Sequence, residues 1–96
     1  MLDDATGHSR LPWIAERLSL LYPDVASVRR ILGQAGVDSR RVALSGHAAD
    51  TWWAAVMEAA HQGRLLALVE CALAEYPHEP YLAALHARLA LEDNRT

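Results

Sequence analysis

Residues 63–77 read GRLLALVECALAEYP, and this stretch indicates the fold class most clearly. It begins with a glycine and ends with a proline, and the apolar residues between them recur every three or four positions. This spacing places one apolar stripe along a helix, because an α-helix makes one turn in about 3.6 residues. The stripe comprises Leu65, Leu68, Val69, Ala72, Leu73 and Tyr76. We therefore expect an amphipathic helix over residues 64–76.

Similar patterns on both sides predict further short helices. They cover 11–21, 24–35, 40–44, 49–62 and a last segment that begins at Pro80. Pro12 and Pro80 suit first helical turns, Asp24 is a suitable N-cap, and Gly36 suits a left-handed C-terminal cap. No segment alternates with period two over the length of a strand. The sequence predicts an all-α, compact bundle of about six short helices, with the domain at 11–92 between flexible ends at 1–10 and 93–96.

The composition restricts the class of protein. The chain has 96 residues, 52% hydrophobic and 22% charged, which fits one globular domain. A net charge of −3 gives no strong attraction to nucleic acid, and a single cysteine excludes an intramolecular disulfide framework. No apolar run approaches the roughly 20 residues of a membrane span, and the acidic start lacks the features of a secretory signal. We expect a soluble cytoplasmic domain whose partners are neither nucleic acid nor membrane.

The tryptophan pair in the segment 49–62 is the first candidate feature for recognition. On a helical projection Trp53 shares a stripe with Val56, Met57 and Ala60, which predicts that Trp53 is buried. Trp52 projects about 100° away from it and is expected at the edge of that stripe. Two interpretations of Trp52 remain open: a partly exposed anchor for a partner, or ordinary peripheral core.

The uneven distribution of charge is the second candidate feature. Residues 1–48 hold six arginines and five acidic residues, whereas residues 49–96 hold three arginines and seven acidic residues. The candidate partner-binding residues are, besides Trp52, the basic Arg29, Arg30, Arg40 and Arg41 and the acidic Glu70, Glu75 and Glu79. Oppositely charged patches could stack copies head to tail. The alternative is that these charges only solvate the outer faces of helices.

The sequence gives no pattern of catalytic residues. The five histidines do not form a His-Glu-x-x-His motif, Ser45 lies outside a Gly-x-Ser-x-Gly elbow, and the five glycines form no phosphate loop. Cys71 projects away from the apolar stripe of its helix. We therefore expect no enzyme, no metal site and no cofactor. A small helical enzyme or ligand carrier stays open as an alternative if His86 or Cys71 lies in a deep pocket with other polar groups.

Several short motifs, taken in order, resemble a known family. They are Leu21-Tyr22-Pro23-Asp24, Ala35-Gly36-Val37-Asp38, Trp53-Ala54-Ala55-Val56, Gly63-Arg64-Leu65 and Ala74-Glu75-Tyr76-Pro77. Over about 11–80 the chain resembles the bacterial effector-associated domain, type one, with Trp53 at the position of the family's tryptophan. The resemblance implies a death-like fold of about six helices. It also implies an adaptor role in bacterial conflict and signalling systems.

The function implied by this resemblance is homotypic pairing without catalysis. Such a domain binds like domains on other proteins, or copies of itself, and thereby recruits an effector such as a protease, nuclease or nucleotidase that is fused to it or encoded nearby. The alternative is a fragment of a tetratricopeptide-like scaffold that binds a peptide. The stretch 74–77, followed by Pro80 and a leucine-bearing helix, resembles a hairpin turn of such scaffolds, although no self-similarity at their period of about 34 residues occurs.

Overall fold

The computed structural model describes residues 2–42 and 47–94, with side chains at 11–40, 42 and 47–92. This part of the chain forms α1 (Leu2–Leu21), α2 (Val25–Ala35), the 3-10 turn η1 (Ser39–Arg41), α3 (Ala48–His61), α4 (Leu65–Glu75) and α5 (Pro80–Asn94). No strand occurs among the described residues. The predicted all-α bundle of short helices is confirmed.

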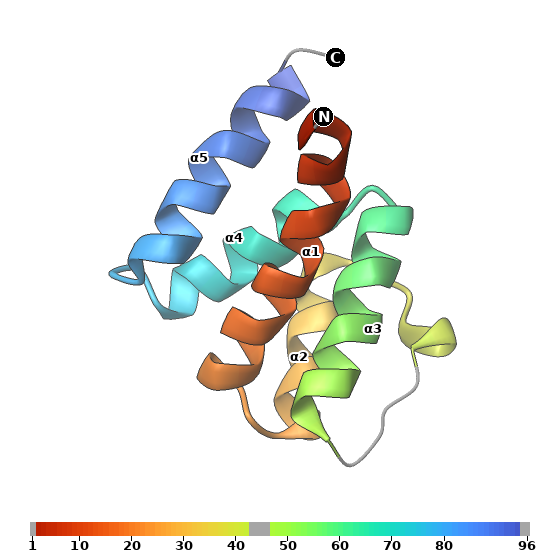
Figure 1. Cartoon of the computed structure of the whole chain (residues 1–96). Coiled ribbons are helices and arrows are strands. Elements are labelled where there is room, and N and C mark those ends of the chain that lie inside the picture. Colours follow the sequence, from red (N-terminus) through yellow and green to blue (C-terminus); the bar gives the residue numbers. More distant parts are fainter. Residues whose placement is uncertain (1, 43–46, 95–96) are drawn as a thin grey trace.

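The helices pack into one bundle (Figure 1). α1 packs along α3, and the two run in opposite directions. α2 contacts both α3 and α4, and α4 in turn contacts α5. In Figure 1, α1 lies in front of α4, between α5 on the left and α3 on the right. One hydrophobic cluster includes buried residues from all five α-helices, so the chain is not a stack of separate hairpins, and the fold disfavours the scaffold alternative.

Local capping explains where the middle helices begin and end. The Asp24 carboxylate accepts a hydrogen bond of 2.9 Å from the backbone N–H of Ser27 and so caps α2. Gly36 ends α2 with a φ of 77°, a left-handed conformation that favours glycine. Gly63 follows α3 with a φ of 72°. These stops confirm the predicted ends of α2 and α3 to within one residue, and the short connection over residues 62–64 lets α3 and α4 pack against each other.

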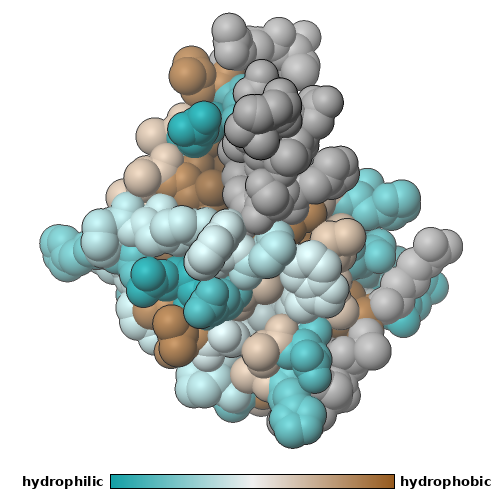
Figure 2. Space-filling view, in the orientation of Figure 1, coloured by the Kyte–Doolittle hydropathy of each residue, from teal (hydrophilic) through white to brown (hydrophobic). Residues whose placement is uncertain are grey.

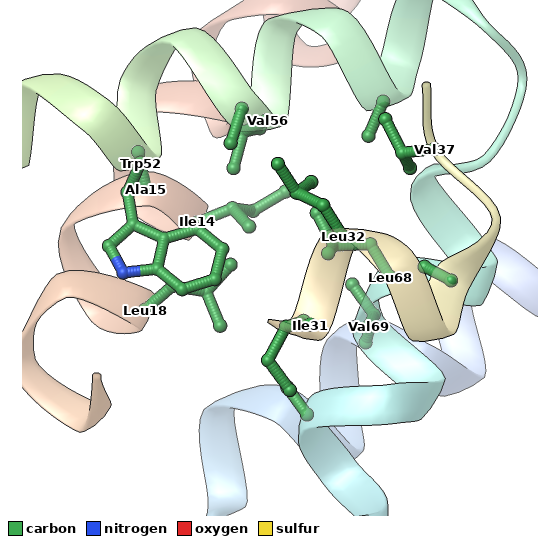
Figure 3. Close-up of a cluster of buried hydrophobic side chains, with 14 of the residues drawn as sticks. Ile14, Ala15, Leu18, Ile31, Leu32, Val37, Trp52, Val56, Leu68 and Val69 are labelled. Atoms are coloured by element: carbon green, nitrogen blue, oxygen red, sulfur yellow. The ribbon is translucent and has the colours of Figure 1, made fainter. Parts of the chain in front are cut away.

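The centre of the bundle is apolar (Figure 3). Side chains from α1, α2, α3 and α4, and one from the connection after α2, converge there; those labelled are Ile14, Ala15, Leu18, Ile31, Leu32, Val37, Trp52, Val56, Leu68 and Val69. Trp52 is the largest fully buried side chain. Its indole N–H donates a hydrogen bond of 2.9 Å to the backbone carbonyl of Tyr22. The only polar atom of the indole is therefore satisfied inside the core.

The first helix is longer than predicted. α1 begins at Leu2 and runs through Pro12, which the sequence placed in a first turn. A proline inside a helix removes one backbone hydrogen bond and crowds the carbonyl four residues earlier, so it weakens the helix at that point. The turns that follow Pro12 are fixed by the burial of Leu11, Ile14 and Leu18. Mobility of residues 1–10 and 93–96 and the domain limits at 11–92 stay predictions.

The segment predicted to be helical over 40–44 is shorter than expected. The structure has only η1 there, and residues 43–46 lie outside the described residues. The Asp38 carboxylate accepts a hydrogen bond of 3.0 Å from the Arg40 backbone N–H and caps this turn. The described chain thus has five α-helices and one 3-10 turn, where about six short helices were expected.

The two tryptophans of α3 have exchanged roles relative to the prediction. Trp52 is fully buried, whereas the side chain of Trp53 is 44% exposed. The buried face of α3 comprises Thr51, Trp52, Ala55, Val56 and Ala59. α3 is rich in alanine, so two neighbouring faces are almost equally apolar, and the hydrogen bond from Trp52 to Tyr22 favours one of them. The prediction that Trp52 is a partly exposed anchor for a partner is therefore wrong.

Candidate interaction surfaces

A polar cluster joins α2 to α4 and contains two of the predicted interface residues. The Arg30 guanidinium forms a salt bridge with the Glu75 carboxylate, and the Tyr22 hydroxyl donates a hydrogen bond of 2.7 Å to Glu75 Oε1. The Arg30 guanidinium also lies 5.9 Å from the centroid of the Tyr22 ring. We call Tyr22, Arg30 and Glu75 the α2–α4 cluster. Arg30 and Glu75 were expected to meet across an interface between copies, but they already bind each other within one chain.

The pKa shifts in the α2–α4 cluster follow from these contacts. Hydrogen bonds from Arg30 and Tyr22 lower the pKa of the Glu75 carboxyl below its ordinary value. Burial, together with the Glu75 carboxylate, raises the pKa of the Tyr22 hydroxyl. Both shifts favour a charged carboxylate that accepts from a neutral phenol. The cluster is therefore a structural link between α2 and α4 at neutral pH.

The other predicted basic residues are dispersed. Arg40 forms a salt bridge of 2.8 Å with Asp38, the N-cap residue of η1. Arg29 is exposed on α2, and the side chain of Arg41 lies outside the described residues. The pKa of Arg40 is raised by its hydrogen bond to Asp38. The structure thus leaves Arg29 as an exposed member of the predicted basic patch and binds Arg30 and Arg40 to carboxylates of their own chain.

The remaining predicted acidic residues also make contacts within the chain. Glu70 of α4 lies 3.1 Å from His86 Nε2 of α5. Glu79 lies 3.3 Å from Arg17 of α1, and its carboxylate accepts a hydrogen bond of 2.6 Å from the backbone N–H of Tyr81. Glu79 therefore caps the start of α5 and ties it to α1. These two carboxylates therefore link helices of one copy, and their role in binding a partner stays a prediction.

The residues considered for catalysis are not brought together. Cys71 is half-buried, and burial together with Glu70 and Glu75 raises the pKa of its thiol, which opposes thiolate formation. His86 contacts Glu70, and Ser45 lies outside the described residues. Among residues with described side chains, no group of three or more His, Cys, Asp or Glu could hold a metal ion. The alternative of a small helical enzyme or carrier gains no support from this geometry.

Two helices each carry a pair of exposed large apolar side chains on the outer face, and these surfaces were not among the predicted interface residues. On α1, Trp13 is 63% exposed and Leu20 is 67% exposed; with Glu16 and Arg17 they form what we call the α1 outer stripe. On α3, Trp53 and Met57 are more than 40% exposed; with Asp50 and His61 they form the α3 outer stripe. Each stripe lies on the face opposite the buried residues of its helix, because its members recur at helical spacing. The sequence did contain a signal for each stripe: besides the buried set, a second set of apolar residues lies on the opposite face of each helix.

A shallow depression accompanies the α1 outer stripe. It has a volume of about 210 Å³ and is lined by Trp13, Glu16, Arg17, Leu20 and Tyr81. The Arg17 guanidinium lies 5.7 Å from the centroid of the Tyr81 ring, and its side chain is 42% exposed. On the face drawn in Figure 2, apolar surface is interleaved with hydrophilic surface and does not gather into one continuous patch. The geometry offers a place for an apolar side chain next to an exposed cation.

Among the described residues, no helix has both the length and the apolar content needed to cross a membrane.

Comparison with known proteins places the chain in a family. The chain matches the family described as Effector-associated domain 1 over residues 6–90. No curated protein and no solved structure matches the chain. The family match includes every segment on which the resemblance was based, from the motif at 21–24 to the motif at 74–77. The chain therefore belongs to the effector-associated domain 1 family.

Proposed function

We propose that this chain is a non-catalytic adaptor domain that acts in the cytoplasm and binds like domains, either on other proteins or on other copies of itself. Homotypic pairing of this kind recruits or assembles the effectors of a bacterial defence or signalling system. The effector is a protease, nuclease or nucleotidase that is fused to the domain or encoded nearby. Family membership supports the association with effectors, and the surface of the domain supports the pairing.

The observation that carries the proposal is the presence of two outer stripes on one small domain. Trp13 and Leu20 lie seven residues apart on the same face of α1, and each exposes more than 60% of its side chain. Single exposed apolar residues need no explanation, but several on one helix face are typical of a binding surface. Tryptophan is also among the residue types that contribute most binding energy at interfaces. The outer stripes are therefore the best candidates for contact with a partner.

The charged residues support this choice by their contacts. Arg30, Glu75 and Glu79 link helices within one copy, so their charges are already partly neutralised there. Arg29 and Arg41 remain candidates for guiding a partner during encounter, since exposed charges affect association rate more than affinity. In this proposal the apolar stripes supply the binding energy.

A concentration series tests the proposal. The isolated domain is examined by sedimentation velocity and light scattering, first alone and then mixed with a second effector-associated domain encoded beside it. We expect the weight-average mass to rise with concentration, or a complex to form with the second domain. The Leu68→Asp variant, which disrupts the buried core, serves as the control for non-specific association of unfolded chains. A chain that stays monomeric at every concentration and binds no like domain would contradict the proposal.

A further inference from the structure

The depression on α1 has the size of a side-chain site. Its volume of about 210 Å³ is below the roughly 300–1,000 Å³ of pockets that hold small molecules. Trp13 and Leu20 lie at either end of the α1 outer stripe, two turns apart, and Arg17 lies between them. The depression is thus suited to one or two apolar side chains that project from a partner.

The α3 outer stripe supplies side chains of that kind. Trp53 and Met57 are one turn apart and are 44% and 42% exposed. Asp50 lies one turn before Trp53 on the same face and is exposed. A helix that presents anchors at such intervals is the usual occupant of an apolar groove on another protein.

We propose that the α3 outer stripe of one copy docks on the α1 outer stripe of a second copy, with Trp53 in the depression between Trp13 and Leu20. This inference rests on the proposed homotypic function and assigns the surfaces that carry it. The two surfaces lie on different helices of the bundle, so the contact joins unlike patches of two identical chains. Each copy then contributes one docking helix, α3, which we call the donor helix, and one docking site, the depression on α1, which we call the acceptor site.

Charge complementarity identifies a second copy as the occupant. The depression presents the guanidinium of Arg17 beside the carboxylate of Glu16, and the docking helix carries the Asp50 carboxylate one turn before Trp53 and the His61 ring about two turns after it. Arg17 already binds Glu79, but a guanidinium has five N–H donors and its side chain is 42% exposed, so a second carboxylate can be accommodated.

Complementation between two variants tests the inference. Leu20→Glu damages the acceptor site, and Trp53→Glu damages the donor helix; glutamate preserves helix propensity in both. We expect each variant alone to self-associate at least about tenfold more weakly than the wild type. An equimolar mixture should form a 1:1 complex, because one intact donor meets one intact acceptor. Leu91→Glu, which replaces a residue 61% exposed near the end of α5, is the matched control and should associate like the wild type.

The outcomes separate the two proposals. If the wild type associates and both variants associate equally well, or if the mixture stays monomeric, the assignment of surfaces is overturned while homotypic pairing stands. If only Leu20→Glu weakens association, the α1 outer stripe docks on a surface other than the α3 outer stripe and the inference is likewise overturned. If the wild type itself remains monomeric and binds no like domain, both proposals fail. Circular dichroism checks that each variant is folded, and Met57→Glu replaces Trp53→Glu should the latter unfold.

Discussion

In the α2–α4 cluster, Tyr22, Arg30 and Glu75 bind one another, whereas on the outer stripes Trp13 and Trp53 face the solvent. The cluster is polar and is satisfied within one copy, and the stripes are apolar and are not covered by the described chain. Polar residues that resembled an interface therefore stabilise the monomer, and apolar residues that resembled core are available to a partner. The role of a side chain in this domain therefore depends on the groups that it contacts after folding, and residue type alone does not define it.

The largest expected effect distinguishes the two adjacent tryptophans. Trp52→Ala removes a fully buried indole and its hydrogen bond to Tyr22, so we expect the free energy of unfolding to fall by about 3–5 kcal/mol. Trp53→Ala removes a side chain on the outer face of α3, and we expect a loss of about 1 kcal/mol or less. Urea denaturation followed by circular dichroism measures both. Equal losses would contradict the assignment of Trp52 to the core.

The second effect concerns the α2–α4 cluster. Arg30→Glu or Glu75→Arg places two like charges beside Tyr22, and we expect each single variant to lower the melting temperature. The double variant, which exchanges the two charges, should recover part of the loss because it restores an opposite pair. Arg29→Glu, one position earlier on α2 and exposed, is the matched control. Weakened self-association with an unchanged melting temperature in the single variants would show instead that this pair acts between copies.

The third effect is a dependence of stability on pH. The pKa of Glu75 is lowered in the folded chain, so as the pH falls the unfolded chain takes up the proton first. The stabilisation is therefore complete above the ordinary carboxyl pKa of about 4.3 and is lost as the pH falls through the lower folded value. The difference in melting temperature between the wild type and Glu75→Gln should shrink in this acidic range. A difference that stays constant from neutral to acidic pH would argue against ionic pairing with Arg30.

The smallest effect is expected at Arg29, the exposed remainder of the predicted basic patch. Arg29→Glu should change the dissociation constant of self-association by less than about twofold at physiological salt, because exposed charges contribute little to affinity. The measurement is sedimentation equilibrium at two salt concentrations beside Leu20→Glu. If Arg29→Glu raised the dissociation constant as much as Leu20→Glu, the interface would include the predicted basic residues.

The helical fold could be predicted because its signals are local. Pro77 ends the stretch after α4, Asp24 caps α2 and Gly36 adopts the left-handed conformation, and each depends on neighbours within four residues. The burial of Trp52 and not Trp53 could not be predicted in the same way. The two candidate stripes of α3 differ by one residue, and the choice depends on Tyr22, which lies 30 residues away in the sequence.

The candidate site was harder to predict than the fold. The pair Arg30 and Glu75 is 45 residues apart in the sequence, so its salt bridge within one chain is visible only after the helices are packed. Trp13 and Leu20 are residue types that are also common in cores. They are exposed because α1 packs its opposite face against α3. Sequence patterns therefore defined the elements, and tertiary packing defined which residues remain for a partner.

The most direct test of the outer stripes uses the three tryptophans of the chain. Each indole N–H gives one signal in a proton–nitrogen NMR spectrum, recorded while the domain is diluted from a concentration at which it associates. We expect the signals of Trp13 and Trp53 to shift with concentration and the signal of Trp52, hydrogen-bonded to the Tyr22 carbonyl, to stay fixed. Association accompanied by fixed signals of Trp13 and Trp53 would contradict the docking of α3 on α1.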